Sequence, residues 1–195
     1  QQQVDSFLRE YNTRSIHELS IHEAMPGHYL QLAHANRFPG TLRALLSSGP
    51  FIEGWAVYAE RLMAEHDYLG ADTLDGRVYK LTVLKMRLRS VTNTLLDIGI
   101  QTEGMARDQA MELMMKGAFQ QEREAAGKWT RANLSSTQLL SYFTGYTEHL
   151  ALREHALQMR LSAEPARAHG FESRSLRGPI DFDSAQRIER GGEAL

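Results

Sequence analysis

The sequence predicts an all-α protein, and three observations support this fold class. Apolar residues recur every three to four positions through most of the chain, which is the spacing of one face of an α-helix. No segment alternates apolar and polar residues as a half-buried strand does, and no internal repeat is present. Groups of Gly, Pro, Ser and Asn divide the helical pattern into several segments.

Composition narrows the class of protein. The chain has 195 residues, of which 42% are hydrophobic and 24% are charged, values typical of a globular domain with its own core. With a formal net charge of -2, it lacks the excess of Lys and Arg typical of nucleic-acid binding, so we expect no nucleic-acid partner. No apolar run approaches the roughly 20 residues of a membrane span. The absence of cysteine excludes a thiolate nucleophile and Cys-ligated zinc.

The first half of the chain predicts three helices. A capping box at Ser15–Glu18, or a second one at Ser20–Glu23, would begin the first helix, and the turn residues Asn36–Gly40 would end it. A short helix is expected over residues 41–47. Residues 51–66 form the third helix, because large apolar side chains recur there at helical spacing: Phe51, Trp55, Tyr58 and Leu62.

The second half predicts three more helices and a tail. A long helix is marked by apolar residues at helical spacing: Leu74, Val78, Leu81, Leu84, Leu88, Val91 and Leu95. Residues 107–126 are rich in good helix formers, and Ser135 with Gln138 would begin a last helix that ends near residue 160. No heptad pattern is sustained enough to predict a coiled coil. We therefore expect a helical domain over residues 1–160 and a divergent, loosely structured tail over residues 161–195.

The most informative segment carries two histidines that flank a glutamate. His22, Glu23 and His28 are residue types found in zinc hydrolases, where imidazoles bind the metal and the Glu takes a proton from water. Six positions separate the histidines, so a straight helix would point them in different directions. Pro26 must distort the helix between them, and the distortion can return His28 to the side of His22. The alternative is a helix that ends near Met25, with both histidines at its end or in solvent.

A third ligand is expected from the helix that follows. A catalytic zinc ion takes three protein ligands and leaves one position open. Glu53 and Glu60 are seven residues apart and share one face of the 51–66 helix, so either carboxylate can reach a neighbouring helix. The alternative is that both are ordinary solvated glutamates.

Several segments together resemble a known family. HEAMPGHYLQ and FIEGWAVYAERLM are similar to the H-E-A-x-P-G-H-x-x-Q and E-G-W-A-x-Y-A-E motifs of a bacterial family catalogued as domain of unknown function eight-eight-five. KMRLRSVTNTLLDIGIQT and FQQEREAAGKWTRANLSSTQLLSYFTGY agree as well. The resemblance covers roughly residues 10–157. It implies an incomplete, helical, zincin-like metallopeptidase catalytic portion, completed by a missing N-terminal domain or a partner chain.

The resemblance also implies roles for individual residues near the two motifs. It places a zinc ion on His22, His28 and Glu53, with Glu23 as the general base. Glu60 would hold a ligand side chain in its orientation.

Further roles follow for residues nearer the C-terminus. Asp97 would help to orient a metal ligand without binding the metal itself. Tyr142, in the family's Tyr-x-x-Gly segment, would polarise the oxyanion of the reaction. Tyr146, a weaker candidate for that role, and Arg153 are expected to contact substrate, with Arg153 binding a carboxylate.

Three features depart from the family pattern. Gln101 stands where many members carry His, and Asn93 stands where many carry Arg. Neither side chain can supply a proton or a positive charge in those places. The C-terminal ending also differs.

These observations lead to one expected function and two alternatives. We expect a zinc-dependent, peptidase-like hydrolase that acts on short peptides through metal-activated water. One alternative is a non-catalytic helical remnant of such an enzyme. The other is a non-haem iron site, which uses the same set of two histidines and one carboxylate.

Overall fold

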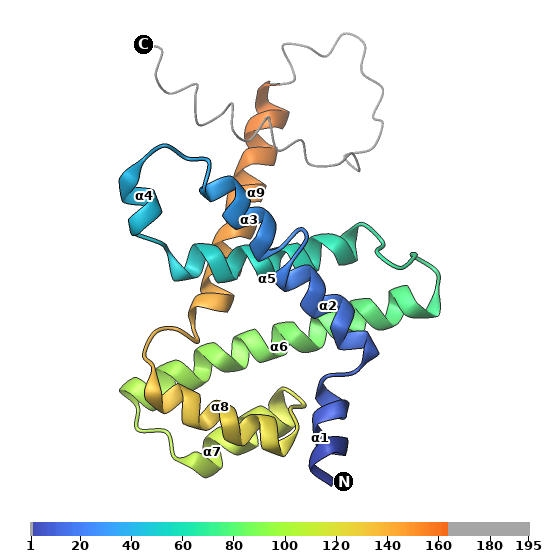
Figure 1. The fold of residues 1–195 in the computed structure, drawn as a ribbon, viewed down its shortest axis with the longest axis vertical. Coiled ribbons are helices and arrows are strands. Elements are labelled where there is room, and N and C mark those ends of the chain that lie inside the picture. The colour runs from blue at the N-terminus through green and yellow to red at the C-terminus, as the bar shows by residue number, and fades with distance from the viewer. Residues whose placement is uncertain (1, 164–195) are drawn as a thin grey trace. The chain divides into compact units, whose positions relative to one another are not determined.

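The chain is all-α, as the sequence predicts, in a computed structural model that describes residues 2–163 (Figure 1). No strand occurs within that range. The helices are α1 (Gln2–Glu10), α2 (Thr13–Glu23), α3 (His28–Ala35), α4 (Thr41–Leu45), α5 (Gly49–Glu65), α6 (Leu74–Thr102), α7 (Arg107–Glu112), α8 (Glu122–Leu134) and α9 (Ser141–Ala163). A π-helical turn, Leu113–Gly117, follows α7.

The chain divides into two units, Gln1–Leu157 and Gln158–Leu195. The first unit holds every residue singled out above as a candidate for the site. The tail expected over residues 161–195 lies, from residue 164 onwards, outside the described residues. None of the described helices is both long enough and apolar enough to cross a membrane.

The core of the first unit consists of three apolar clusters along α5 and α6. The first joins α2 and α5 to the N-terminal half of α6 through Ile21, Ala59, Tyr79 and Val83. The second joins α5 to α9 through Val57, Tyr58, Leu62 and Tyr146. The third joins the C-terminal half of α6 to the segment that runs from α7 to α8 through Leu96, Ala110, Met114 and Ala125. The helix α6 therefore packs against different helices at its two ends.

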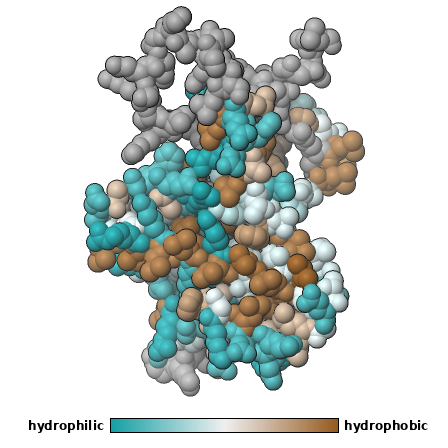
Figure 2. All heavy atoms as spheres, turned by 180° about the vertical axis from the view of Figure 1, so that it is seen from behind, coloured by the Kyte–Doolittle hydropathy of each residue, from teal (hydrophilic) through white to brown (hydrophobic). Residues whose placement is uncertain are grey.

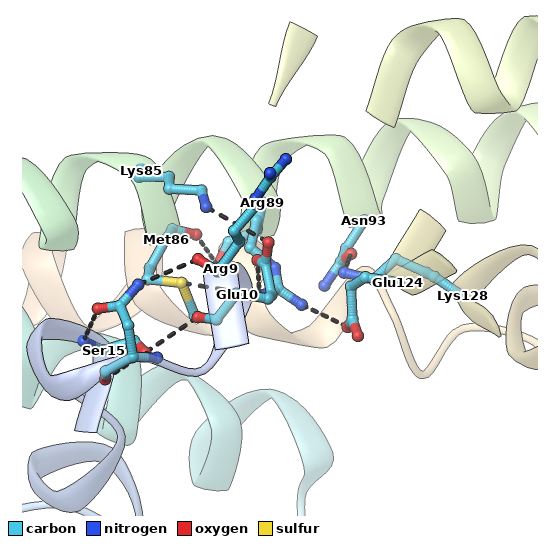
Figure 3. Close-up of polar contacts among 11 residues, drawn as sticks. Arg9, Glu10, Ser15, Lys85, Met86, Arg89, Asn93, Glu124 and Lys128 are labelled. Atoms are coloured by element: carbon cyan, nitrogen blue, oxygen red, sulfur yellow. Dashed lines mark hydrogen bonds and ion pairs between the residues drawn. The ribbon is translucent and has the colours of Figure 1, made fainter. Parts of the chain in front are cut away.

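The first helices begin earlier than predicted. The N-cap of α2 is Asn12, whose side chain accepts hydrogen bonds from the backbone N–H groups of Arg14 and Ser15 at 2.9 and 3.2 Å. Ser15, the third residue of the helix, completes this capping box, because its hydroxyl accepts from the Asn12 N–H at 2.9 Å. The preceding helix, α1, has no counterpart in the prediction. Buried Glu10 fixes its end to α6 by pairing with Arg89 at 2.8 Å (Figure 3).

The helix predicted over residues 107–126 is interrupted. Its chain turns after the π-helical segment, where Phe119 has a positive φ of 55°. The turn lets Met114 and Ala125, on either side of it, pack on Leu96 of α6. Trp129 lies in α8 and packs on the same cluster. Tertiary burial overrides the local helix propensity here.

The last helix begins six residues later than predicted, at Ser141 instead of Ser135. Ser135 is the C-cap of α8. Asp97 of α6 causes the difference, because its two carboxylate oxygens accept hydrogen bonds from the backbone N–H groups of Thr137 and Leu140, each at 3.1 Å. Asp97 therefore holds residues 137–140 in a turn, and α9 begins only after this turn.

Candidate metal centre

The two histidines of the motif lie on two different helices. The helix α2 ends at Glu23, a turn follows, and His28 is the first residue of α3. The sequence predicts one distorted helix; the structure has two, because Pro26 lacks the N–H that would continue α2. The imidazoles of His22 and His28 are nonetheless adjacent, with ring centroids 4.8 Å apart and planes at 89°.

Gly27 allows this turn to pass close to the end of α2. A Cβ at this position would lie 1.9 Å from the carbonyl oxygen of His22 and 2.2 Å from that of Ile21, distances that no side chain tolerates. On the other side, the indole Nε1 of Trp55 donates a hydrogen bond of 2.8 Å to the Pro26 carbonyl. The turn is therefore held between α2 and α5, which fixes where α3 begins.

Glu53 of α5 completes a group of three potential ligands. Its Oε2 lies 3.8 Å from Nε2 of His22 and 3.5 Å from Nε2 of His28. One donor atom from each residue lies within 4.8 Å of the others, and all three side chains are partly buried. Bonds of about 2.0–2.1 Å in a tetrahedral zinc site place two ligand atoms about 3.4 Å apart. The residues present therefore match the number, type and spacing of protein ligands that a catalytic zinc ion uses.

Glu60 lies on the opposite side of the His22 ring. Nδ1 of His22 donates a hydrogen bond of 2.6 Å to Oε1 of Glu60, whose side chain is only 4% exposed. This bond places the proton on Nδ1 and leaves Nε2 as the ligand atom toward His28 and Glu53. Nδ1 of His28, in contrast, is buried and has no hydrogen-bond partner within residues 2–163.

Glu18 is a buried member of this centre that sequence reasoning missed. It lies one turn before His22 on α2, is 2% exposed, and forms a second group of close ligand-type atoms with His22 and Glu60. Burial, the charge of Glu60 and the hydrogen bond shared with Glu60 all raise the pKa of Glu18. Glu18 is thus the carboxyl group of the pair that holds a proton more readily. The spacing of four residues between Glu18 and His22 was the available signal.

The charges of the three candidate ligands affect one another. Burial opposes a charge on His22, but its hydrogen bond to Glu60, its close approach to Glu53 and the negative charge of Glu60 outweigh it and raise its pKa to about 10. Burial likewise opposes a charge on Glu53, but its contacts with His22, His28 and Tyr142 lower its pKa overall. The raised pKa of His22 favours a positive imidazolium beside these carboxylates. A cation that replaced the proton would meet the same negative charges.

Tyr142 lies beside this group, on the first turn of α9. Its hydroxyl accepts hydrogen bonds from Arg131 and Gln138, each at 3.3 Å. The same hydroxyl is near enough to Glu53 to help lower the pKa of that carboxylate. The side chain is partly buried. The structure therefore brings the tyrosine of one motif to the glutamate of another.

A close crossing of α5 and α9 produces this proximity. A Cβ at Gly54 would lie 2.4 Å from the Cα atom of Gly145, and one at Gly145 would lie 1.7 Å from the carbonyl oxygen of Pro50. The two backbones can meet only because both residues lack a side chain. Gly54 follows Glu53, and Gly145 is three residues after Tyr142. The crossing thus sets the distance between the two functional side chains.

Glu23, expected as the general base, is exposed at the last residue of α2. Among the described residues, its carboxylate makes no hydrogen bond or ion pair. Its predicted role depends on a bound substrate and stays a prediction.

Three predicted site residues are not brought to the ligands. Both carboxylate oxygens of Asp97 bind the turn before α9. Tyr146 is 3% exposed, its hydroxyl accepts from Arg61 at 3.0 Å, and the Arg87 guanidinium lies 4.4 Å from its ring centroid. Tyr146 is therefore part of the core between α5 and α9.

Arg153 lies toward the other end of α5. It pairs with Glu65 at 2.7 Å. Glu65 is 12 residues beyond Glu53 on the same helix, which is about 18 Å at 1.5 Å per residue. The guanidinium is thus held well away from the candidate ligands.

The two positions that depart from the family pattern have structural partners. Gln101 donates hydrogen bonds to the carbonyl groups of Ala132 and Ser135 at the end of α8. Asn93 accepts one of 2.9 Å from Nζ of the buried Lys128 (Figure 3). Burial and the positive charge of Arg89, partly opposed by Glu124, lower the pKa of this lysine to about 7.

The fold and the centre define the class of protein: an all-α protein in which two histidines and a glutamate from three helices form a metal-type cluster. The chain belongs to the family described as "Bacterial protein of unknown function (DUF885)", whose model matches residues 2–176. A search of curated proteins finds no significant match.

A solved structure supports the fold. The chain is similar, at 36% identity and a TM-score of 0.70, to a protein of unknown function from Shewanella oneidensis that is described as a candidate lipoprotein. The match covers 97% of this chain and 34% of that one. The chain thus spans about a third of the length of this relative.

Proposed function

We propose that the chain carries the catalytic centre of a zinc-dependent, peptidase-like hydrolase that acts on short peptides. The observation that carries the proposal is the convergence of His22, His28 and Glu53, whose donor atoms all lie within 4.8 Å of one another. A bound zinc ion would supply an activated water molecule with a pKa near 7 and would polarise a carbonyl group.

The residues of the chain would divide the remaining work. Glu60 holds His22 through Nδ1, so that Nε2 is the ligand atom. Glu23, adjacent to His22 and free of other partners among the described residues, would take a proton from the attacking water and deliver it to the leaving amine. The Tyr142 hydroxyl, next to Glu53, would donate to the oxygen that becomes negative as the carbonyl is attacked.

The adjacency of Glu23 and His22 favours hydrolysis over oxygen chemistry. A non-haem iron oxygenase uses the same three ligands but does not require a general base beside them. Glu23 is such a base, and its exposure at the end of α2 keeps it accessible to water.

The metal is tested directly by titrating the purified chain with zinc, and with iron(II) in the absence of oxygen, in a calorimeter. We expect one zinc ion per chain. His22→Ala, His28→Ala and Glu53→Ala should each weaken binding by at least about 100-fold, since two ligands make a poor site. His155→Ala removes an exposed histidine and is the matched control. Unchanged affinity in all three variants, or preferential binding of iron, contradicts the proposal.

The reaction is tested on a library of short peptides, with products identified by mass spectrometry. Because the chain spans 34% of its Shewanella relative, the assay uses both this chain and that whole protein, each loaded with zinc. Metal-dependent cleavage by either supports the proposal. Failure of both proteins, when both bind zinc, contradicts peptide hydrolysis and leaves the metal site intact.

A further inference from the structure

The long helix α6 has an unusual distribution of side chains. From residue 78 to residue 100, every exposed position carries leucine or isoleucine: Leu81, Leu84, Leu88, Leu95 and Ile98. Their exposed fractions are 65%, 55%, 41%, 47% and 42%. The buried face of the same stretch includes polar residues and a glycine: Ser90, Thr92, Asn93, Asp97 and Gly99. An ordinary surface helix has a polar exposed face.

The exposed residues follow a seven-residue repeat. Leu74, Leu81, Leu88 and Leu95 are spaced by seven, and Leu84, Val91 and Ile98 occupy the second position of the repeat. Arg77 is the exception at that second position. The repeat is confined to this one helix, so the expectation that the sequence alone predicts no coiled coil stays a prediction.

This leucine stripe, defined as Leu74, Leu81, Leu84, Leu88, Leu95 and Ile98, is long and continuous. From Leu74 to Ile98 it extends about 36 Å at 1.5 Å per residue. Figure 2, which shows the face opposite to that of Figure 1, has a band of hydrophobic side chains across its middle, where α6 runs. Contiguous apolar surface of this extent is typical of an interface.

The solved relative indicates what covers the stripe. The matched part of the Shewanella protein has the same fold as this chain but makes up only 34% of its length, so about two thirds of that protein lies outside the match. A remainder of this size is large enough to cover an apolar surface of the matched part. On this chain, α6 offers an apolar face in the register that a second helix requires.

We propose that the leucine stripe is the docking surface for a long amphipathic helix equivalent to one in the unmatched two thirds of the Shewanella protein. The two helices pack side by side, with the partner's apolar residues between the leucines in the manner of a coiled coil. The other face of α6 carries Tyr79, which packs on α2 and α5 and donates a hydrogen bond to the Glu60 carbonyl. The docked helix thus packs on the side of α6 away from the candidate metal centre and stabilises the helix on which that centre rests.

The decisive experiment compares this chain with the whole Shewanella protein. In each, the residues at positions 84 and 88, or their structural equivalents, are changed together to Gln, and thermal unfolding is measured. The midpoint should fall by about 10 °C or more in the longer protein, where the residues are covered, and by less than about 2 °C in this chain. Changing the position equivalent to Leu134, which is 82% exposed at the end of α8, is the control and should have little effect in either.

Two results would overturn the proposal. A small effect of the double change in both proteins would mean that nothing covers the stripe. If light scattering shows that this chain is a dimer, and that Leu84→Gln with Leu88→Gln makes it a monomer, the occupant is a second copy of the chain instead.

Discussion

The Nδ1 atom of His22 lies 2.6 Å from Oε1 of Glu60, while Nε2 of the same ring lies 3.8 Å from Oε2 of Glu53. The two glutamates, seven residues apart on α5, therefore meet one imidazole from its two sides. Glu60 accepts the hydrogen bond from Nδ1, whereas Glu53 and His28 lie on the side of Nε2. This division of roles between two similar carboxylates is the basis of the first prediction.

Glu60→Gln should weaken zinc binding by about 10–100-fold without abolishing it. Glutamine can still accept the Nδ1 hydrogen bond, but it removes the negative charge that makes His22 a better ligand. Calorimetric titration with zinc measures the change. Glu112→Gln, at an exposed glutamate of α7, is the control and should bind zinc normally. Complete loss of binding would show that Glu60 is itself a ligand.

Glu23→Gln should keep the fold and the metal and lose most of the activity. The change preserves size but removes the base, which typically lowers the rate by about 10²–10⁴. The peptidase rate and the zinc content are measured on the same preparation. Undiminished hydrolysis would exclude Glu23 as the base, and loss of zinc would make it a ligand.

Tyr142→Phe should lower turnover by about 10²–10³ and leave zinc affinity within a few-fold of the original. The hydroxyl lies near Glu53 but is not one of the three candidate ligand groups. Rate and affinity are compared with those of Tyr29→Phe, which changes an exposed tyrosine on α3. A parallel loss of zinc in the Tyr142 variant would mean that its role is structural.

Gly54→Ala should destabilise the protein by about 1–3 kcal/mol, because the new methyl group would force α5 and α9 apart. Chemical denaturation measures the free energy of unfolding. Gly127→Ala is the matched control, since a Cβ there would meet no atom within 4 Å and alanine is the better helix former. Equal stability of the two variants would contradict the close crossing of α5 and α9.

Lys128→Met should reduce the dependence of stability on pH between about pH 7 and pH 10. Burial lowers the pKa of Lys128 to about 7, whereas in the unfolded chain it is about 10.4. Within this window the unfolded chain binds a proton that the folded chain does not, so the lysine makes stability rise with pH, by up to about 1.4 kcal/mol per unit.

The measurement is the difference in unfolding free energy between wild type and variant at several pH values, which removes the contribution of other groups. Lys116→Met, at an exposed lysine beside Glu112, is the control and should leave the slope unchanged. A Lys128 variant with the slope of the wild type would show that this amine stays charged in the fold.

Much of the site follows from the spacing of residues along the chain. Pro26 requires an interruption between the two histidines, and the seven-residue step between Glu53 and Glu60 requires that they share a helix face. Both inferences depend on local backbone geometry, so no neighbour is needed to make them. The same reasoning missed Glu18, which faces Glu60 of a helix more than 30 residues away.

The sequence by itself determined the all-α fold, the breaks between most helices and the motif residues that converge, because helical periodicity and proline are local properties of the chain. Only the tertiary structure decided what each face meets. The crossing at Gly54 and Gly145 buries Tyr146, the turn at residues 137–140 occupies Asp97, and the packing of α6 on its neighbours turns its leucines outward. Periodicity shows which residues share a face, but the surface that covers this face is set by segments distant in sequence.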